Sequence, residues 1–178
     1  MGIFGGNSSP FDQMVEKVTD EKNTGEDWGM IMSVCDRVGA TQTGPKECLK
    51  AIMKRLNHQD PHVVMQAITL LDACVNNCGK YFLLEVASRE FENDFKKLLT
   101  KSHPKIVEKL KAMLKRWAEG EFSKDSQYSL IPSLYSNLKK EGMDISGGDS
   151  QPISPYFPRA LCLCLLRYTS EVLTLVRN

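Results

Sequence analysis

Apolar residues recur at three- and four-residue steps along most of the chain up to Gly142, which is the pattern of amphipathic α-helices. The most apolar stretch, residues 63–78, carries apolar side chains on almost every face. Asp60 can cap its start, Pro61 suits a first helical position, and Gly79 suits a stop. A helix with so little polar surface must be surrounded by other helices. The pattern therefore predicts a buried central helix.

Other segments show one apolar stripe each at helical spacing. They are residues 11–19, 26–38, 43–56, 81–86, 91–99, 102–117 and 129–140. A capping box formed by Thr24 and Asp27 is expected to start the second of them. Short links between helices favour antiparallel neighbours. The pattern therefore predicts an all-α fold, a right-handed superhelix of about eight helices that forms one α-solenoid domain.

The chain divides into three parts by composition. Residues 1–9 are expected to form a flexible lead, and residues 10–145 form the helical domain. Residues 146–178 begin as a Gly-, Ser- and Pro-rich linker and continue as an apolar tail without a clear amphipathic face. We expect this last part to be disordered.

Charge is balanced overall but uneven along the chain. Lys and Arg number 23 and Asp and Glu 22, so the net charge of +1 does not favour nucleic acid. Residues 11–37 hold seven acidic and three basic side chains, whereas residues 96–116 hold eight basic and one acidic. This basic stretch is either the solvated back of two helices or a patch for acidic lipid headgroups such as phosphoinositides, or for an acidic protein signal. Lys101, Lys105 and Lys109 are its candidate contacts. No aromatic residues alternate with these lysines for base stacking, so nucleic acid is not an expected partner.

Motifs that carry catalysis are missing from the sequence. It holds no Gly-rich phosphate loop, no G-x-S-x-G and no ordered Ser/His/Asp or Cys/His set, so we expect no enzyme and no cofactor. His58 and His62 are four residues apart, but they flank the expected helix start, where turn and cap roles are more natural than a metal site.

The cysteines show no metal or redox spacing. Six are present, none in a C-x-x-C pair, which favours an intracellular, reduced protein. Cys74 and Cys78 lie on the central apolar segment, where reduced thiols act as small hydrophobic groups, so core packing is expected for both.

Trp28 and Met32 lie one turn apart and partly off the apolar stripe of their segment. Either Trp28 anchors this helix in the core, or the pair forms a small binding patch beside Gly29. The acidic residues Glu26, Asp27 and Asp36 would form the rim of such a patch.

Several motifs together resemble the VHS domain, and most closely that of the signal-transducing adaptor molecule (STAM) family, over about residues 10–145. They are Phe11-Asp12, Glu26-Asp27-Trp28-Gly29, Gly44-Pro45-Lys46, Asn57-His58-Gln59-Asp60-Pro61-His62-Val63, Ala67-Ile68-Thr69-Leu70-Leu71-Asp72, Asn76-Asn77-Cys78-Gly79, Phe82, Glu85-Val86-Ala87-Ser88-Arg89, Phe91, Pro104-Lys105 and Trp117. The resemblance implies the VHS/ENTH-like superhelix of eight helices.

The resemblance also implies weak binding of ubiquitin on the second and fourth helices. The family's central tryptophan maps to Trp28, next to Gly29, and the position one turn later maps to Met32, where the family commonly has Leu or Ile. On the fourth helix, the candidates expected to face outward are Asp72, Ala73 and Asn76.

Partners and location follow from the same resemblance. It implies an adaptor for ubiquitinated cargo that is cytoplasmic and peripheral to the early endosome membrane, with an Hrs-type sorting partner. STAM proteins continue into a ubiquitin-interacting motif, an SH3 domain and a coiled coil, and none of these is visible in residues 146–178, which suggests truncation after the domain. Related VHS domains of Golgi adaptors bind acidic-dileucine signals between their sixth and eighth helices, which keeps the basic stretch open as an alternative site.

Overall fold

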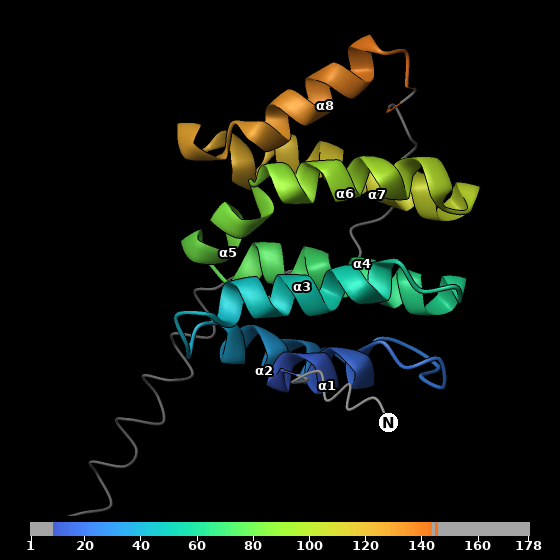
Figure 1. Ribbon diagram of the computed structural model, residues 1–178, viewed down its shortest axis with the longest axis vertical. Helices are drawn as coiled ribbons and strands as arrows, with labels where there is room; N and C mark the ends of the chain where they lie inside the picture. The colour runs from blue at the N-terminus through green and yellow to red at the C-terminus, as the bar shows by residue number, and fades with distance from the viewer. Residues whose placement is uncertain (1–8, 144, 146–178) are drawn as a thin grey trace, which may run out of the picture.

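In the part of the chain that the structure describes, eight α-helices are stacked in successive layers (Figure 1). The computed structural model describes residues 9–143 and Ile145, and no β-strand occurs within them. The helices are α1 (Pro10–Val18), α2 (Trp28–Val38), α3 (Gly44–Leu56), α4 (Pro61–Asn77), α5 (Lys80–Val86), α6 (Arg89–Lys101), α7 (Pro104–Glu119) and α8 (Leu130–Lys140), with the 3-10 turns η1 (Glu121–Ser123) and η2 (Ser126–Tyr128) between α7 and α8. This confirms the predicted all-α solenoid.

Side-chain caps determine where several helices begin. Asp60 accepts a hydrogen bond from the backbone N–H of His62, and Pro61 opens α4, as predicted. The predicted capping box of Thr24 and Asp27 is wrong. Asp27 is itself the N-cap, because its carboxylate accepts the N–H of Met30 at 2.9 Å, and α2 therefore begins at Trp28. This shift places Trp28 in the first turn of α2.

The central position predicted for α4 is confirmed. It packs against α1, α2, α3, α5 and α7, and Ile68, Leu70 and Leu71 on it are fully buried. In Figure 1, α3 and α4 lie between the layer of α1 and α2 and the layer of α6 and α7. The helix is apolar on most faces because neighbouring helices cover most of its circumference.

Aromatic side chains join α7 to α6 and to the 3-10 turns that follow α7. The ring of Trp117 lies 6.4 Å from Phe91 on α6 and 5.7 Å from Phe122 on η1, and Phe122 lies edge-on to Tyr128 at 5.8 Å. Offset or edge-on ring contacts at these distances are favourable. The cluster therefore connects α7 with α6 and with the two 3-10 turns.

Two of the predicted parts of the chain fall largely outside the described residues. The flexible lead of residues 1–9 overlaps the description only at Ser9, which caps α1. Residues 146–178 lie wholly outside it. The expectations for both segments therefore remain predictions.

Candidate functional site

Trp28 and Met32 lie on the first two turns of α2. Trp28 is half-buried and packs against the edge of the core, while Met32, one turn later, is half-buried as well. Gly29 between them is exposed, and a side chain added there would meet only the Asp27 carboxylate, at 3.2 Å. The first two turns of α2 therefore offer an indole, a flexible thioether and an open stretch of backbone, which together can contact an apolar partner.

Two of the three candidates on α4 do not face outward. Asp72 is 7% exposed and Ala73 is 5% exposed, which corrects the expectation for both. The reason is the packing of α7 against α4: Asp72 accepts hydrogen bonds from the Trp117 indole at 2.8 Å and from the Arg116 guanidinium at 3.1 Å. Asp72 is therefore a structural contact between these helices rather than a surface residue.

Asn76 and Met65 are the partly exposed residues on this side of α4. Asn76 is half-buried, and its amide donates to the backbone carbonyl of Asp72 at 2.8 Å. Met65, which the sequence analysis did not single out, is half-buried one turn before Thr69. Periodicity could not have distinguished Met65 from its neighbours, because almost every residue of α4 around it is apolar.

Hydrogen bonds among three residues connect the segment just before α2 with α4 and α7. The Thr69 hydroxyl donates to the Glu26 carboxylate at 2.9 Å and accepts from the Lys109 ammonium at 3.1 Å. Burial lowers the pKa of Lys109, while the nearby Glu26 and Asp72 carboxylates oppose part of that shift. The chain that enters α2 is thus held in place just before Trp28.

The surroundings of Trp28 are acidic. Glu26, Asp27 and Asp36 are all exposed on or beside α2. Carboxylates around an apolar centre favour partners whose own apolar patch is surrounded by basic groups.

Half of the basic residues between positions 96 and 116 form ion pairs or hydrogen bonds within the domain. Lys96 pairs with Glu92 at 3.0 Å, Lys97 with Asp94 at 2.8 Å and Arg116 with Asp72 at 3.1 Å, while Lys109 is directed to Thr69. Lys101 and Lys105 are exposed and form no ion pair within the described part of the chain. Of the three candidate lysines, Lys109 is thus half-buried and only Lys101 and Lys105 are freely accessible.

The histidines have the turn and helix-start contacts expected for them. The Nδ1 atom of His58 accepts the N–H of Asp60 at 3.1 Å, and the Nε2 atom of His62 lies 2.7 Å from the carbonyl oxygen of Asn23. The potential metal ligands that do converge in the described residues are Cys35, Cys74 and Cys78.

The stack of amphipathic helices defines the class of this protein as an all-helical solenoid domain. The family model of the VHS domain matches residues 6–142, and the chain belongs to this family. The VHS family is one of trafficking adaptors rather than enzymes.

Relatives from animals and fungi agree with the family assignment. The chain is 33% identical over 153 residues to the chicken (Gallus gallus) "Target of Myb1 membrane trafficking protein", covering 83% of this chain and 30% of that protein. It is 35% identical over 135 residues to the Neurospora crassa "Class E vacuolar protein-sorting machinery protein hse1", covering 75% of this chain and 18% of that protein. The chain therefore spans less than a third of either relative.

The fold also matches a solved structure. The crystal structure of the VHS and FYVE tandem domains of Hrs, a protein involved in membrane trafficking and signal transduction, superposes with a TM-score of 0.73 and 25% identity, covering 82% of this chain and 66% of that one. Among the described residues, none of the helices has the length and apolar character needed to cross a membrane.

Proposed function

We propose that this domain is a ubiquitin-binding adaptor module that acts in the endosomal sorting of ubiquitinated membrane cargo toward multivesicular bodies and lysosomes. The observation that carries the proposal is the partly exposed pair of Trp28 and Met32 in the first turns of α2, with open backbone at Gly29 between them. An indole that is packed on one side and accessible on the other is a typical anchor for a partner's apolar patch.

The electrostatics of α2 support ubiquitin as the partner. The apolar patch of ubiquitin is surrounded by basic groups, and Glu26, Asp27 and Asp36 supply opposite charges around Trp28. On α4, Met65 and Asn76 are the partly exposed residues that could extend the contact. A patch this small should bind with a dissociation constant on the order of 0.1–1 mM and rely on multivalent cargo for avidity.

The place in the cell is proposed from the relatives. One is named a membrane trafficking protein and another a vacuolar protein-sorting machinery protein. We infer that the domain works in the cytoplasm at the surface of early endosomes, as in the STAM family, alongside an Hrs-type sorting partner. The chain spans only part of these relatives, so a partner of this kind is proposed from the family and not from a surface of this domain.

An NMR titration of the isotope-labelled chain with monoubiquitin tests the proposal. We expect shifts to cluster at Trp28, Gly29 and Met32, and Trp28→Ala to weaken binding at least about tenfold because the apolar anchor is removed. Tyr81→Ala is the matched control, since Tyr81 is an aromatic side chain on α5 that is 76% exposed and lies outside the proposed site.

The spectrum of Trp28→Ala without ubiquitin shows whether the fold persists. Loss of binding in a folded Trp28→Ala variant, with binding retained in Tyr81→Ala, supports the proposal. The absence of shifts in the wild-type chain at near-millimolar ubiquitin, or equal losses in both variants, contradicts it.

A second candidate function is favoured by the exposed Lys101 and Lys105. These two lysines stand where α6 ends and α7 begins, and they could contact phosphoinositide headgroups or an acidic sorting signal. Co-sedimentation with phosphoinositide vesicles should fall when both are changed to Glu. Lys109→Met should leave it unchanged, because Lys109 is directed into the domain. Vesicle binding that is insensitive to the double change would exclude this site.

A further inference from the structure

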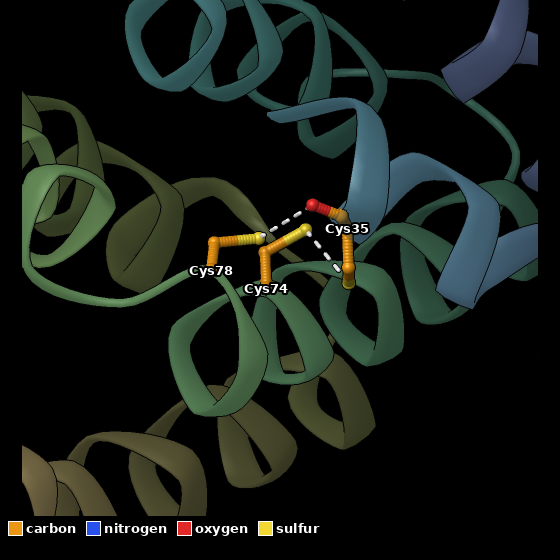
Figure 2. Close-up of side chains that lie close together, drawn as sticks. All are labelled: Cys35, Cys74 and Cys78. Carbon is orange, nitrogen blue, oxygen red and sulfur yellow. Dashed lines mark hydrogen bonds between the residues drawn. The ribbon is translucent and has the colours of Figure 1, made fainter. Parts of the chain in front are cut away.

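Three cysteine sulfurs converge where α2 packs on the end of α4. Cys35 comes from α2, while Cys74 and Cys78 lie one turn apart at the end of α4. The three Sγ atoms all lie within 4.8 Å of one another, and those of Cys35 and Cys74 are 3.9 Å apart. Figure 2 shows the side chains of Cys74 and Cys78 pointing toward Cys35. Residues 39 positions apart in the chain thus place their sulfurs in contact.

Two of the three cysteines are buried, and the third is partly exposed. Cys74 is fully buried and Cys35 is 5% exposed, whereas Cys78 is half-buried at the C-cap of α4. The Cys78 thiol also lies 3.8 Å from the backbone carbonyl oxygen of Cys35. Cys78 is therefore the most accessible of the three cysteines.

The donor set is sulfur alone. No His, Asp or Glu of the described residues belongs to the cluster. Thiolates select soft metal ions such as Cu(I) and Zn(II), whereas Mg²⁺, Ca²⁺ and Mn²⁺ prefer oxygen. Sulfurs at the corners of a three-coordinate site with metal–sulfur distances of about 2.3 Å are separated by about 4.0 Å, a spacing that the cluster approaches.

The number of sulfur ligands distinguishes between Cu(I) and Zn(II) as the bound ion. Structural zinc sites are almost always tetrahedral with four ligands. This cluster supplies three sulfurs that are mutually close, whereas the Cys48 thiol contacts Cys74 but does not belong to the group. A monovalent ion that accepts three sulfur ligands fits better than zinc.

We propose that Cys35, Cys74 and Cys78 form a three-coordinate thiolate site for one Cu(I) ion, which would link α2 to α4. The ion enters as Cu(I) from a Cu(I)–thiol complex, so no electron is transferred. Each thiol that binds the metal loses its proton to solvent and becomes a thiolate ligand. The proposal does not depend on ubiquitin binding.

The test uses the full chain with Cys162→Ser and Cys164→Ser, so that tail thiols cannot bind metal. Under anaerobic conditions, Cu(I) is titrated in competition with a chromophoric Cu(I) chelator. We expect one Cu(I) per chain, three sulfur neighbours by X-ray absorption, and no displacement by a tenfold excess of Zn(II). Cys78→Ser, at the most accessible ligand, should weaken binding at least about 100-fold, since even loss of outer contacts to metal ligands costs 10–100-fold.

Ile131→Val is the matched control, because it trims a buried side chain of α8, a helix that packs on α6 and α7 away from the three cysteines. It should keep the Cu(I) affinity within about threefold. Circular dichroism of the metal-free variants checks that each one folds. The proposal is overturned if the chelator removes all Cu(I), if Cys78→Ser binds as well as the parent, if Ile131→Val loses the metal as Cys78→Ser does, or if Zn(II) displaces it.

Discussion

At the scale of single residues, Asp72 shows how one buried carboxylate can hold two helices together. Its two oxygens accept from the Trp117 indole and the Arg116 guanidinium, so both ends of the group are satisfied although it is 7% exposed. A buried charge is tolerated only when it is paired and hydrogen-bonded in this way. The contact fixes α7 against α4 and thereby determines which side of α4 remains open.

The Asp72→Asn substitution tests this role. It keeps an acceptor for Trp117 but removes the charge that compensates Arg116, so we expect the free energy of unfolding to fall by about 2–3 kcal/mol. Urea denaturation followed by circular dichroism measures the loss. Asp94→Asn makes the same chemical change in an exposed pair with Lys97 and should cost less than about 1 kcal/mol. Equal effects of the two changes would refute the structural role of Asp72.

At the scale of elements, α6 is stabilised at its start by charge. Glu92 in its first turn is 6% exposed and forms ion pairs with Lys96 at 3.0 Å and Arg89 at 3.1 Å. The hydrogen bond from Lys96, with smaller contributions from the charges of Lys96 and Arg89, lowers the pKa of this carboxyl although burial opposes the shift. A carboxylate in the first turn also lies favourably at the positive end of the helix dipole.

The stability that Glu92 contributes should depend on pH. Because its pKa is lower in the folded than in the unfolded chain, the contribution is complete above the unfolded value of about 4.3 and is lost as pH falls through the folded pKa. Glu92→Gln should therefore lower the unfolding free energy by about 1 kcal/mol at pH 7 and approach the wild type in strong acid. Urea titrations at several pH values measure the difference.

Glu90→Gln is the control for this pH series. Glu90 is an exposed carboxylate of the same helical turn and forms no ion pair within the described residues. A difference between Glu92→Gln and wild type that stays constant from pH 7 into strong acid would contradict the mechanism.

The junction of α4 and α5 depends on a glycine conformation. Gly79 has φ +76° and ψ −165°, a region that side chains with a Cβ rarely adopt. We expect Gly79→Ala to lower the unfolding free energy by about 1–3 kcal/mol. Gly25→Ala, where an added Cβ meets no atom within 4 Å, should be nearly neutral in the same denaturation assay. An unchanged unfolding free energy in Gly79→Ala would show that the junction of α4 and α5 relaxes without strain.

At the scale of the whole molecule, one continuous core joins all the helical layers. The cluster of buried side chains runs from Phe11 on α1 to Leu138 on α8. Trp28 and Trp117 lie in different layers of the stack, on α2 and α7. They report on separate parts of a single cooperative unit.

We therefore expect the domain to unfold in one transition. Fluorescence of Trp28→Phe, which reports Trp117, should give the same urea midpoint as that variant's far-UV circular dichroism. Fluorescence of Trp117→Phe, which reports Trp28, should likewise coincide with its own circular dichroism. Separate midpoints within either variant would mean that the layers unfold independently and that the core is not one cooperative unit.

Much of the fold could be predicted because helix signals are local. The apolar periodicity, Pro61 at a helix start and Asp60 as its cap all act within a few residues, and the structure agrees with them. The start of α2 was misplaced because Thr24 and Asp27 are both good caps, and the sequence does not decide between competing caps.

The chain by itself determined the helices, their order, the burial of α4 and the presence of Trp28 and Met32 near the start of α2, because these depend on residues close in sequence. Only the tertiary structure decided that Asp72 and Ala73 are covered, that Lys109 is directed inward, and that Cys35 meets Cys74 and Cys78. On an almost wholly apolar helix, periodicity cannot say which side a neighbour covers. That choice is made by contacts between residues about 40 positions apart, such as Asp72 with Trp117 and Cys35 with Cys74.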